Sequence, residues 1–135
     1  MDVQKAISFV EKHGTELEKY RLHCLLGKER DDEVPLRYLK GLQNDDGGFP
    51  YENEKGKLSC VLNTSANLGL MIELGIAESD VCRKTAEYLL GVQSRDGGWN
   101  ENDEIQQYNP PFWDLPGDPK TKIWLSADVC NHLVQ

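Results

Sequence analysis

A twelve-residue segment occurs twice in this chain, and this repeat constrains the possible fold more than any other feature. Residues 38–49 align without gaps on residues 88–99, and seven of the twelve positions are identical. The shared residues include a glutamine, an aspartate and two adjacent glycines, and each copy ends in an aromatic residue. A fixed internal period of this size is typical of proteins built from stacked supersecondary units. The sequence therefore predicts a repeat architecture.

The apolar residues around the two copies recur with helical spacing. One stripe runs through Val81, Thr85 and Leu89, and Thr15 with Glu18 forms a capping box at the start of another helix. No segment shows the strict alternation of a half-buried strand, so an all-α class is predicted. We expect six helices, near residues 2–13, 15–27, 33–43, 60–75, 79–93 and 121–134.

The repeated residues are suited to ending one helix and turning the chain. A glycine with positive φ stops the helix, and the glutamine amide can bind free carbonyls of the last turn or a neighbouring loop. The aspartate can accept from turn amides, and the aromatic residue can pack back on the helix end. We call these groups the first clasp (Gln43, Asp46, Gly47 and Phe49) and the second clasp (Gln93, Asp96, Gly97 and Trp99).

The two clasps resemble a known motif. Residues 93–99 fit the QW motif, Gln-x(2–5)-Gly-x-Trp, of the terpene cyclase and protein prenyltransferase superfamily, and residues 43–49 fit with Phe in place of Trp. Residues 124–129 resemble the helix that follows a QW loop, where a Ser/Thr-x-Asp-Val pattern recurs. Residues 63–68 occupy the corresponding place after the first clasp. The resemblance covers about residues 33–135.

This resemblance implies α/α hairpin repeats that form half of an (α/α)6 toroid. Residues 1–135 are then a single repeat domain, with a degenerate hairpin over about 1–30 and repeats over about 33–78 and 79–135. A half ring leaves an apolar inner face uncovered, which a monomer rarely tolerates. We therefore expect self-association, or a second half of the toroid in a longer protein.

The resemblance also implies a function. It predicts a terpene cyclase- or prenyltransferase-like protein that acts on or binds an isoprenoid or other apolar substrate. The Asp-x-Asp-Asp acid of squalene-type cyclases is not found here, and Asp128 keeps only its first aspartate. Asp128 is thus the candidate catalytic residue, and no cofactor is expected. The alternative is a non-catalytic helical-repeat module for interaction or assembly.

A zinc site is a further possibility raised by the resemblance. Protein prenyltransferases hold zinc through an Asp-x-Cys pair and a distant His, and Asp128, Cys130 and His132 have part of this pattern. On one helix, however, Asp128 and His132 share a face, whereas Cys130 lies about 200° from Asp128. These three residues are weak candidates, and the preferred interpretation is no metal, a packed Cys130 and solvated Asp128 and His132.

Residues 100–120 form a long connection without helical periodicity. The segment holds four of the six prolines, together with Tyr108, Phe112 and Trp113. Connections of this length are often lids, binding loops or disordered strips. Its aromatic residues are expected to cover the end of a cavity or to pack on a partner copy, and its acidic residues are expected to be solvated.

The composition narrows the classes of partner. Fifteen Lys and Arg against 23 Asp and Glu give a net charge of −8, and no basic cluster is present. This balance argues against nucleic-acid binding. No apolar run is long enough to span a membrane and no secretory signal is visible, so a cytoplasmic protein with four reduced cysteines is expected.

Overall fold

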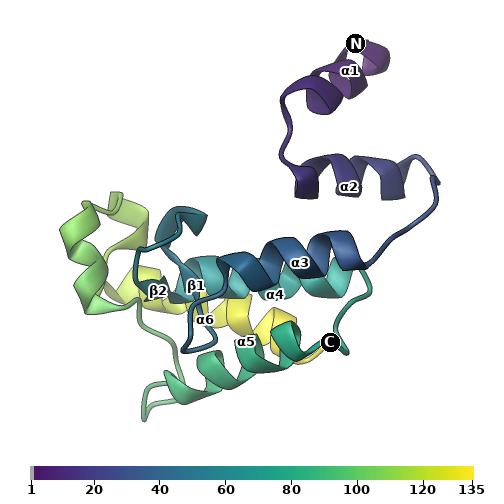
Figure 1. Ribbon diagram of the computed structural model, residues 1–135. Coiled ribbons are helices and arrows are strands. Elements are labelled where there is room, and N and C mark those ends of the chain that lie inside the picture. Colours follow the sequence, from purple (N-terminus) through teal and green to yellow (C-terminus); the bar gives the residue numbers. More distant parts are fainter. Residues whose placement is uncertain (1) are drawn as a thin grey trace. The chain divides into compact units, whose positions relative to one another are not determined.

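The computed structural model describes residues 2–135, and its main elements are six α-helices (Figure 1). The helical class is confirmed, and each helix begins and ends within two residues of its predicted bounds. The helices are α1 (Val3–His13), α2 (Glu16–Leu25), α3 (Glu33–Leu42), α4 (Val61–Glu73), α5 (Asp80–Gly91) and α6 (Pro119–Leu133). The described chain divides into two compact units, one ending at Gly41 and one covering Leu42–Gln135.

The first unit contains the α1–α2 hairpin. The predicted capping box at its turn is confirmed: the Glu18 amide donates to Thr15 Oγ1, and the Thr15 amide donates to Glu18 Oε2 at 2.7 Å. Glu11 of α1 and His23 of α2 are joined by a contact of 2.8 Å. None of residues 3–13 is fully buried: Ile7 and Val10 are half-buried, and Val3 and Ala6 at the start of α1 are exposed.

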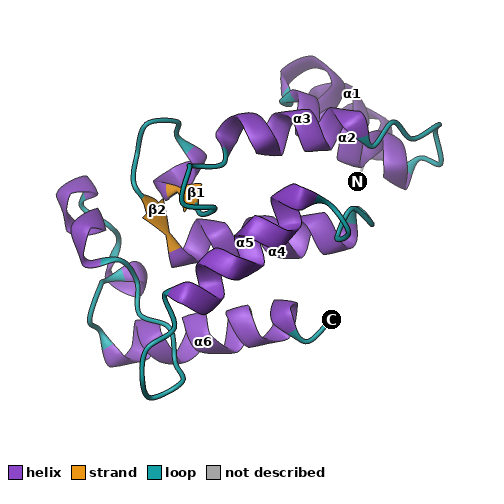
Figure 2. Ribbon diagram, turned by 60° about the horizontal axis from the view of Figure 1, so that its bottom comes forward, coloured by secondary structure: helices purple, strands orange, loops and turns teal. Residues whose placement is uncertain are grey.

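In the second unit, α4 packs against both α5 and α6 (Figure 2). The buried core between these helices includes Leu68, Met71, Val81, Leu89, Leu125 and Val129. Ahead of α4, the short strands β1 (Phe49–Pro50) and β2 (Ser59–Cys60) pair antiparallel, with Phe49 opposite Cys60. This small sheet was not predicted, because strands of two residues carry no alternating pattern.

The segment 100–120 has more structure than its sequence predicts. It contains two 3₁₀ helices, η2 (Asp103–Tyr108) and η3 (Phe112–Asp114), and a third, η1 (Tyr51–Asn53), follows β1. Ile105 of η2 is buried against Tyr51 and Cys60, and the Tyr108 ring stacks on Tyr51 at 5.5 Å. A 3₁₀ helix has three residues per turn and is short, so its sequence does not show the 3.6-residue period of an α-helix. The segment therefore packs on the start of α4.

Among residues 2–135, no helix is both long and apolar enough to cross a bilayer. The half-toroid arrangement and the single repeat domain remain predictions.

Candidate functional site

The first clasp links the turn after α3 to helix α5. Gln43 Nε2 donates to the Gly47 carbonyl at 2.9 Å, to the Val81 carbonyl at 3.0 Å and to Thr85 Oγ1 at 3.1 Å. Asp46 Oδ1 accepts from the Gly48 amide, which satisfies the turn. The predicted contact of the glutamine amide with a nearby loop carbonyl is confirmed at Gly47, and the amide also reaches α5, which was not predicted.

The second clasp has the same local geometry. Gln93 Nε2 donates to the Gly97 carbonyl at 2.8 Å, and Asp96 Oδ1 accepts from the Gly98 amide at 3.2 Å. Gly47 and Gly97 both have φ of 88°, a conformation that strongly favours glycine. The prediction of two equivalent turns is therefore confirmed at the level of individual hydrogen bonds.

The aromatic residues anchor each clasp to the helix that follows it. Phe49 and Trp99 are buried, as predicted. The Phe49 amide donates to Thr64 Oγ1 and the Trp99 amide donates to Ser126 Oγ, both at 2.8 Å. Each hydroxyl in turn donates at 2.6 Å to the carbonyl four residues earlier, which belongs to the N-cap residue Cys60 for Thr64 and to Lys122 of α6 for Ser126. Both hydroxyls lie in the segments that follow the motif, and Ser126 is the serine of the Ser/Thr-x-Asp-Val pattern.

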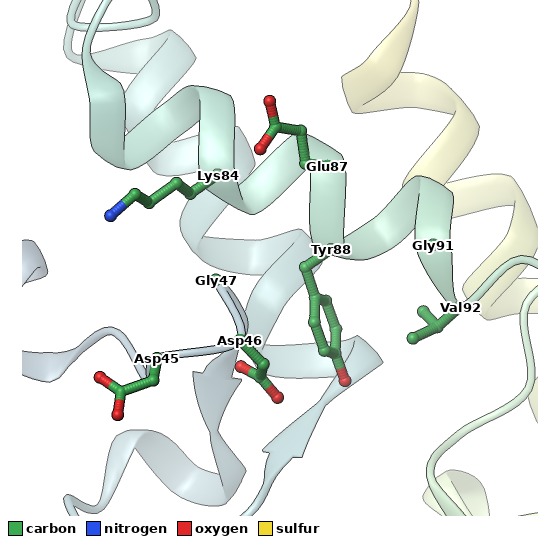
Figure 3. Close-up of a pocket in the computed structure, with 8 residues that line it drawn as sticks. All are labelled: Asp45, Asp46, Gly47, Lys84, Glu87, Tyr88, Gly91 and Val92. Carbon is green, nitrogen blue, oxygen red and sulfur yellow. The ribbon is translucent and has the colours of Figure 1, made fainter.

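An open groove of about 570 Å³ lies beside the first clasp (Figure 3). Its lining includes the acidic Asp45 and Asp46 on the turn and Lys84 on α5. The Tyr88 side chain extends from α5 toward the turn beside Asp46, and burial, followed by the charge of Asp46, raises the pKa of its hydroxyl. The mixed charges of the lining select no single class of ligand.

The candidate catalytic residue Asp128 is held at the contact between α4 and α6. Ser65 Oγ donates to Asp128 Oδ2 at 2.7 Å and lies 3.1 Å from His132 Nδ1, while Nδ1 and Oδ2 are 3.9 Å apart. Ser65 is buried, whereas the Asp128 side chain is 37% exposed. Ser65 was not predicted as a member of this cluster, because it reaches Asp128 from another helix.

This trio is arranged to fix side chains rather than to activate a nucleophile. In a Ser-His-Asp triad, the histidine lies between the serine and the aspartate and takes the serine proton. Here Ser65 lies in the middle and its proton points to Asp128. The His132 ring packs against Gly69, where a Cβ would come within 2.5 Å of Nε2. The cluster therefore joins α4 and α6 at close range.

The zinc candidates are only partly brought together. Asp128 and His132 share a face of α6, as the helical spacing predicts, and Cys130 is exposed. The expectation of a packed Cys130 with solvated Asp128 and His132 was therefore wrong, because α6 turns the other face toward α4. Across residues 2–135, no group of three or more His, Cys, Asp or Glu side chains is placed to hold a metal ion.

Two acidic residues of the segment 100–120 are buried, contrary to the expectation that its acids are solvated. Glu101 accepts from the Val61 amide at 2.7 Å and the Leu62 amide at 2.9 Å, so it caps α4 from 40 residues away. The helix dipole stabilises a carboxylate at this end. Burial nevertheless raises the pKa of Glu101, although the amides that it accepts from oppose the shift.

Asp114 is the second buried acid. Its side chain is fully enclosed, and neither carboxyl oxygen has a hydrogen-bond partner among the described residues. Burial, and then the charge of Glu101, raise its pKa from 3.8 to about 7. No local pattern marks this residue, because its burial depends on how η3 folds back on the unit.

An aromatic groove of about 320 Å³ lies between η3 and the start of α6. Its apolar lining comes from Phe112, Trp113, Leu115 and Trp124. The Trp113 carbonyl accepts from Trp124 Nε1 at 2.9 Å and from Thr121 Oγ1 at 3.3 Å, which fixes η3 to the helix. The Phe112 side chain is 82% exposed at the mouth of the groove.

Comparisons with protein-family models, with curated proteins and with solved structures found no match to this chain.

Proposed function

We propose that this chain is a terpene cyclase- or prenyltransferase-like repeat protein that binds an isoprenoid or a similar apolar ligand. The class assignment is supported by the two clasps, which share their glutamine, aspartate and glycine contacts and their links to the following helix. The ligand assignment is supported above all by one observation, the aromatic groove between η3 and α6. Ligand sites are typically concave and lined by apolar and aromatic side chains, with few polar groups.

The chemistry of the groove suits an unsaturated hydrocarbon chain. Two indoles and a phenyl ring offer large apolar faces to a ligand, and their burial by the ligand provides the driving force. Asp118 and Lys120 at the groove carry opposite charges, so the site has no strong preference for an anionic or cationic group. A volume of about 320 Å³ fits a short chain or one end of a longer one.

Binding is better supported than catalysis. An acid that protonates an alkene works in a cavity closed to water, because water captures the carbocation that forms. The Asp128 side chain is 37% exposed and accepts a hydrogen bond from Ser65. This environment suits a residue that holds two helices together, so Asp128 is a weak candidate for the protonating acid.

The second candidate function is a non-catalytic assembly module. Four large apolar side chains are exposed on α5, on α6 and just beyond them: Leu90, Val92, Ile123 and Val134. Association of two copies would remove such surface from water. In this reading the chain completes its ring with a second copy, whether or not the aromatic groove holds a ligand.

Binding of farnesol, a small isoprenoid alcohol, tests the proposed function. We expect farnesol to change the tryptophan fluorescence and to give a saturable calorimetric titration. Phe112→Ala should weaken the affinity at least several-fold, because the ring lies at the mouth of the groove. Mass spectrometry of the purified protein should detect apolar molecules carried from the host.

Phe9→Ala is the matched control, since Phe9 is also an exposed phenylalanine and lies in α1. It should bind farnesol like the wild type. Wild-type protein that gives no saturable titration would contradict the proposal, as would equal affinities for Phe112→Ala and Phe9→Ala.

A further inference from the structure

The two clasps share their local geometry, and each is anchored to the helix that follows it, but only in the first does the glutamine also bind a helix. The Gln43 amide extends beyond its turn to Val81 and Thr85 on α5. Within the part of the chain that the structure describes, the Gln93 amide donates to Gly97 alone. The Gln93 amide can therefore donate a further hydrogen bond. In the first clasp, the corresponding amide and turn surface bind helix α5.

The glycines show the same difference. A Cβ at Gly47 would lie 2.6 Å from the Lys84 carbonyl, so α5 packs directly on the bare glycine backbone. A Cβ at Gly97 would have no atom within 4 Å among the described residues. Glycine is needed at both positions for the positive φ, but only Gly47 also accommodates a helix. The space next to Gly97 corresponds to the space next to Gly47 that α5 occupies in the first clasp.

The occupied clasp defines what such a helix must offer. The face of α5 at the first clasp contains residues 81, 84, 85 and 88, which have the spacing i, i+3, i+4 and i+7. It supplies a main-chain carbonyl from the first helical turn and approaches closely enough to touch glycine. Beside the second clasp, Leu90 is 58% exposed and adds an apolar rim.

Helix α1 has these features, and the first part of its apolar side is exposed, whereas Ile7 and Val10 are half-buried in the hairpin with α2. Residues 3, 6, 7 and 10 are apolar and have the same i, i+3, i+4 and i+7 spacing. Val3 in the first turn is 56% exposed, Ala6 is small and also exposed, and no residue of α1 is buried. In the order of the hairpins, α1 is also a first helix, as α5 is.

We propose that the second clasp is the docking site for helix α1 of a second copy of this chain. In a two-fold dimer, the second clasp of each copy would bind helix α1 of the other copy. The contact then occurs twice, and the assembly is closed. Gln93 then donates to a first-turn carbonyl of the partner's helix, as Gln43 does to Val81. This inference rests on the self-association in the proposed function and adds the surfaces that form the contact.

Sedimentation equilibrium over a range of protein concentrations tests the contact. We expect wild type to reach the mass of a dimer and Gly97→Ala to remain monomeric, because the added methyl group occupies the docking surface. Gly56→Ala is the matched control, since Gly56 also has positive φ and open space around its Cβ. Both variants carry the same backbone strain, and only Gly97→Ala should lose the dimer.

A second pair of variants tests the helix side without altering a turn. Val3→Glu places a charge on the apolar side of α1 and should abolish the dimer. Gln4→Glu adds the same charge to the neighbouring exposed position and should not. Circular dichroism confirms that each variant is folded. Val92→Asp provides a further clasp-side variant that should also be monomeric.

The possible outcomes separate the inference from the proposed function. A wild-type dimer that persists equally in Gly97→Ala and Val3→Glu would overturn the docking site and leave self-association in place. A wild type that stays monomeric at all concentrations would overturn both the docking site and self-association. Farnesol binding tests the aromatic groove alone, so its result does not depend on whether the protein forms a dimer.

Discussion

The Gln43 amide nitrogen lies 3.1 Å from the Thr85 hydroxyl, and this contact joins the turn after α3 to the next repeat. The same nitrogen reaches the Val81 carbonyl, and Thr85 itself donates to that carbonyl at 2.8 Å. The small network ties two segments that are about forty residues apart in the chain. Its counterpart at Gln93 is confined to one turn.

Replacing each clasp glutamine by alanine should therefore have unequal effects. Gln43→Ala removes hydrogen bonds to three acceptors and should lower the free energy of unfolding by about 2–3 kcal/mol. Gln93→Ala removes one hydrogen bond and should lower it by about 1 kcal/mol or less. Urea unfolding at a protein concentration below self-association measures both. Equal losses for the two variants would show that the bridge to α5 adds little.

Asp114 should make stability fall as the pH rises. Its pKa is about 7 in the folded protein, against an ordinary value of 3.8. Between about pH 4 and pH 7, the folded state therefore binds a proton that the unfolded chain has released, and stability decreases across that window. The slope is about 1.4 kcal/mol per pH unit, and the curve flattens above pH 7.

Asp114→Asn should remove most of this slope, because the amide cannot ionise. Asp103→Asn is the control, since Asp103 is an exposed acid in the same segment. Urea midpoints from pH 4 to 8 give the comparison. The raised pKa of Glu101 acts in the same direction and leaves a residual slope in Asp114→Asn. A wild type whose stability rises between pH 4 and 7 would contradict the assignment.

Replacing Glu101 by glutamine should uncap α4. The carboxylate uses both oxygens to accept from the Val61 and Leu62 amides, whereas glutamine has a single acceptor oxygen. One buried amide would lose its partner, at about 1–3 kcal/mol. Amide hydrogen exchange at Leu62 should become faster, while Glu104→Gln, at an exposed position, should leave it unchanged.

Two glycine-to-alanine variants should shift stability in opposite directions. At Gly69 the added Cβ would come within 2.5 Å of His132 Nε2, so His132 must move and its contact with Ser65 is lost. Gly91 has open space at its Cβ and lies in the last turn of α5. Gly91→Ala should gain up to about 1 kcal/mol from helix propensity, and Gly69→Ala should lose at least as much. Thermal unfolding provides the measurement.

The helices and both clasps were predictable because their signals are local. The Thr15–Glu18 box, the helical spacing around Val81 and the positive φ at Gly47 each depend on residues a few positions apart. The contacts that define the candidate sites depend on tertiary packing instead. Ser65 meets Asp128 from 63 residues away, and the face of α6 that turns inward decides that Cys130 is exposed.

The segment 100–120 shows the same limit. Its prolines and aromatic residues mark it as unusual, but sequence periodicity does not reveal that Glu101 caps α4 or that Asp114 is enclosed. A carboxylate at a helix start is recognisable when it is adjacent in sequence, as at an ordinary N-cap. When it comes from 40 residues downstream, only the folded arrangement identifies it.

That long-range cap has a consequence for the order in which the protein is made. During synthesis on the ribosome, the start of α4 leaves the exit tunnel about 40 residues ahead of Glu101, so its first two amides lack this partner over that interval. The start of α4 can lock only when Glu101 has left the exit tunnel. The nascent chain therefore completes its native helix start only after the second clasp has emerged.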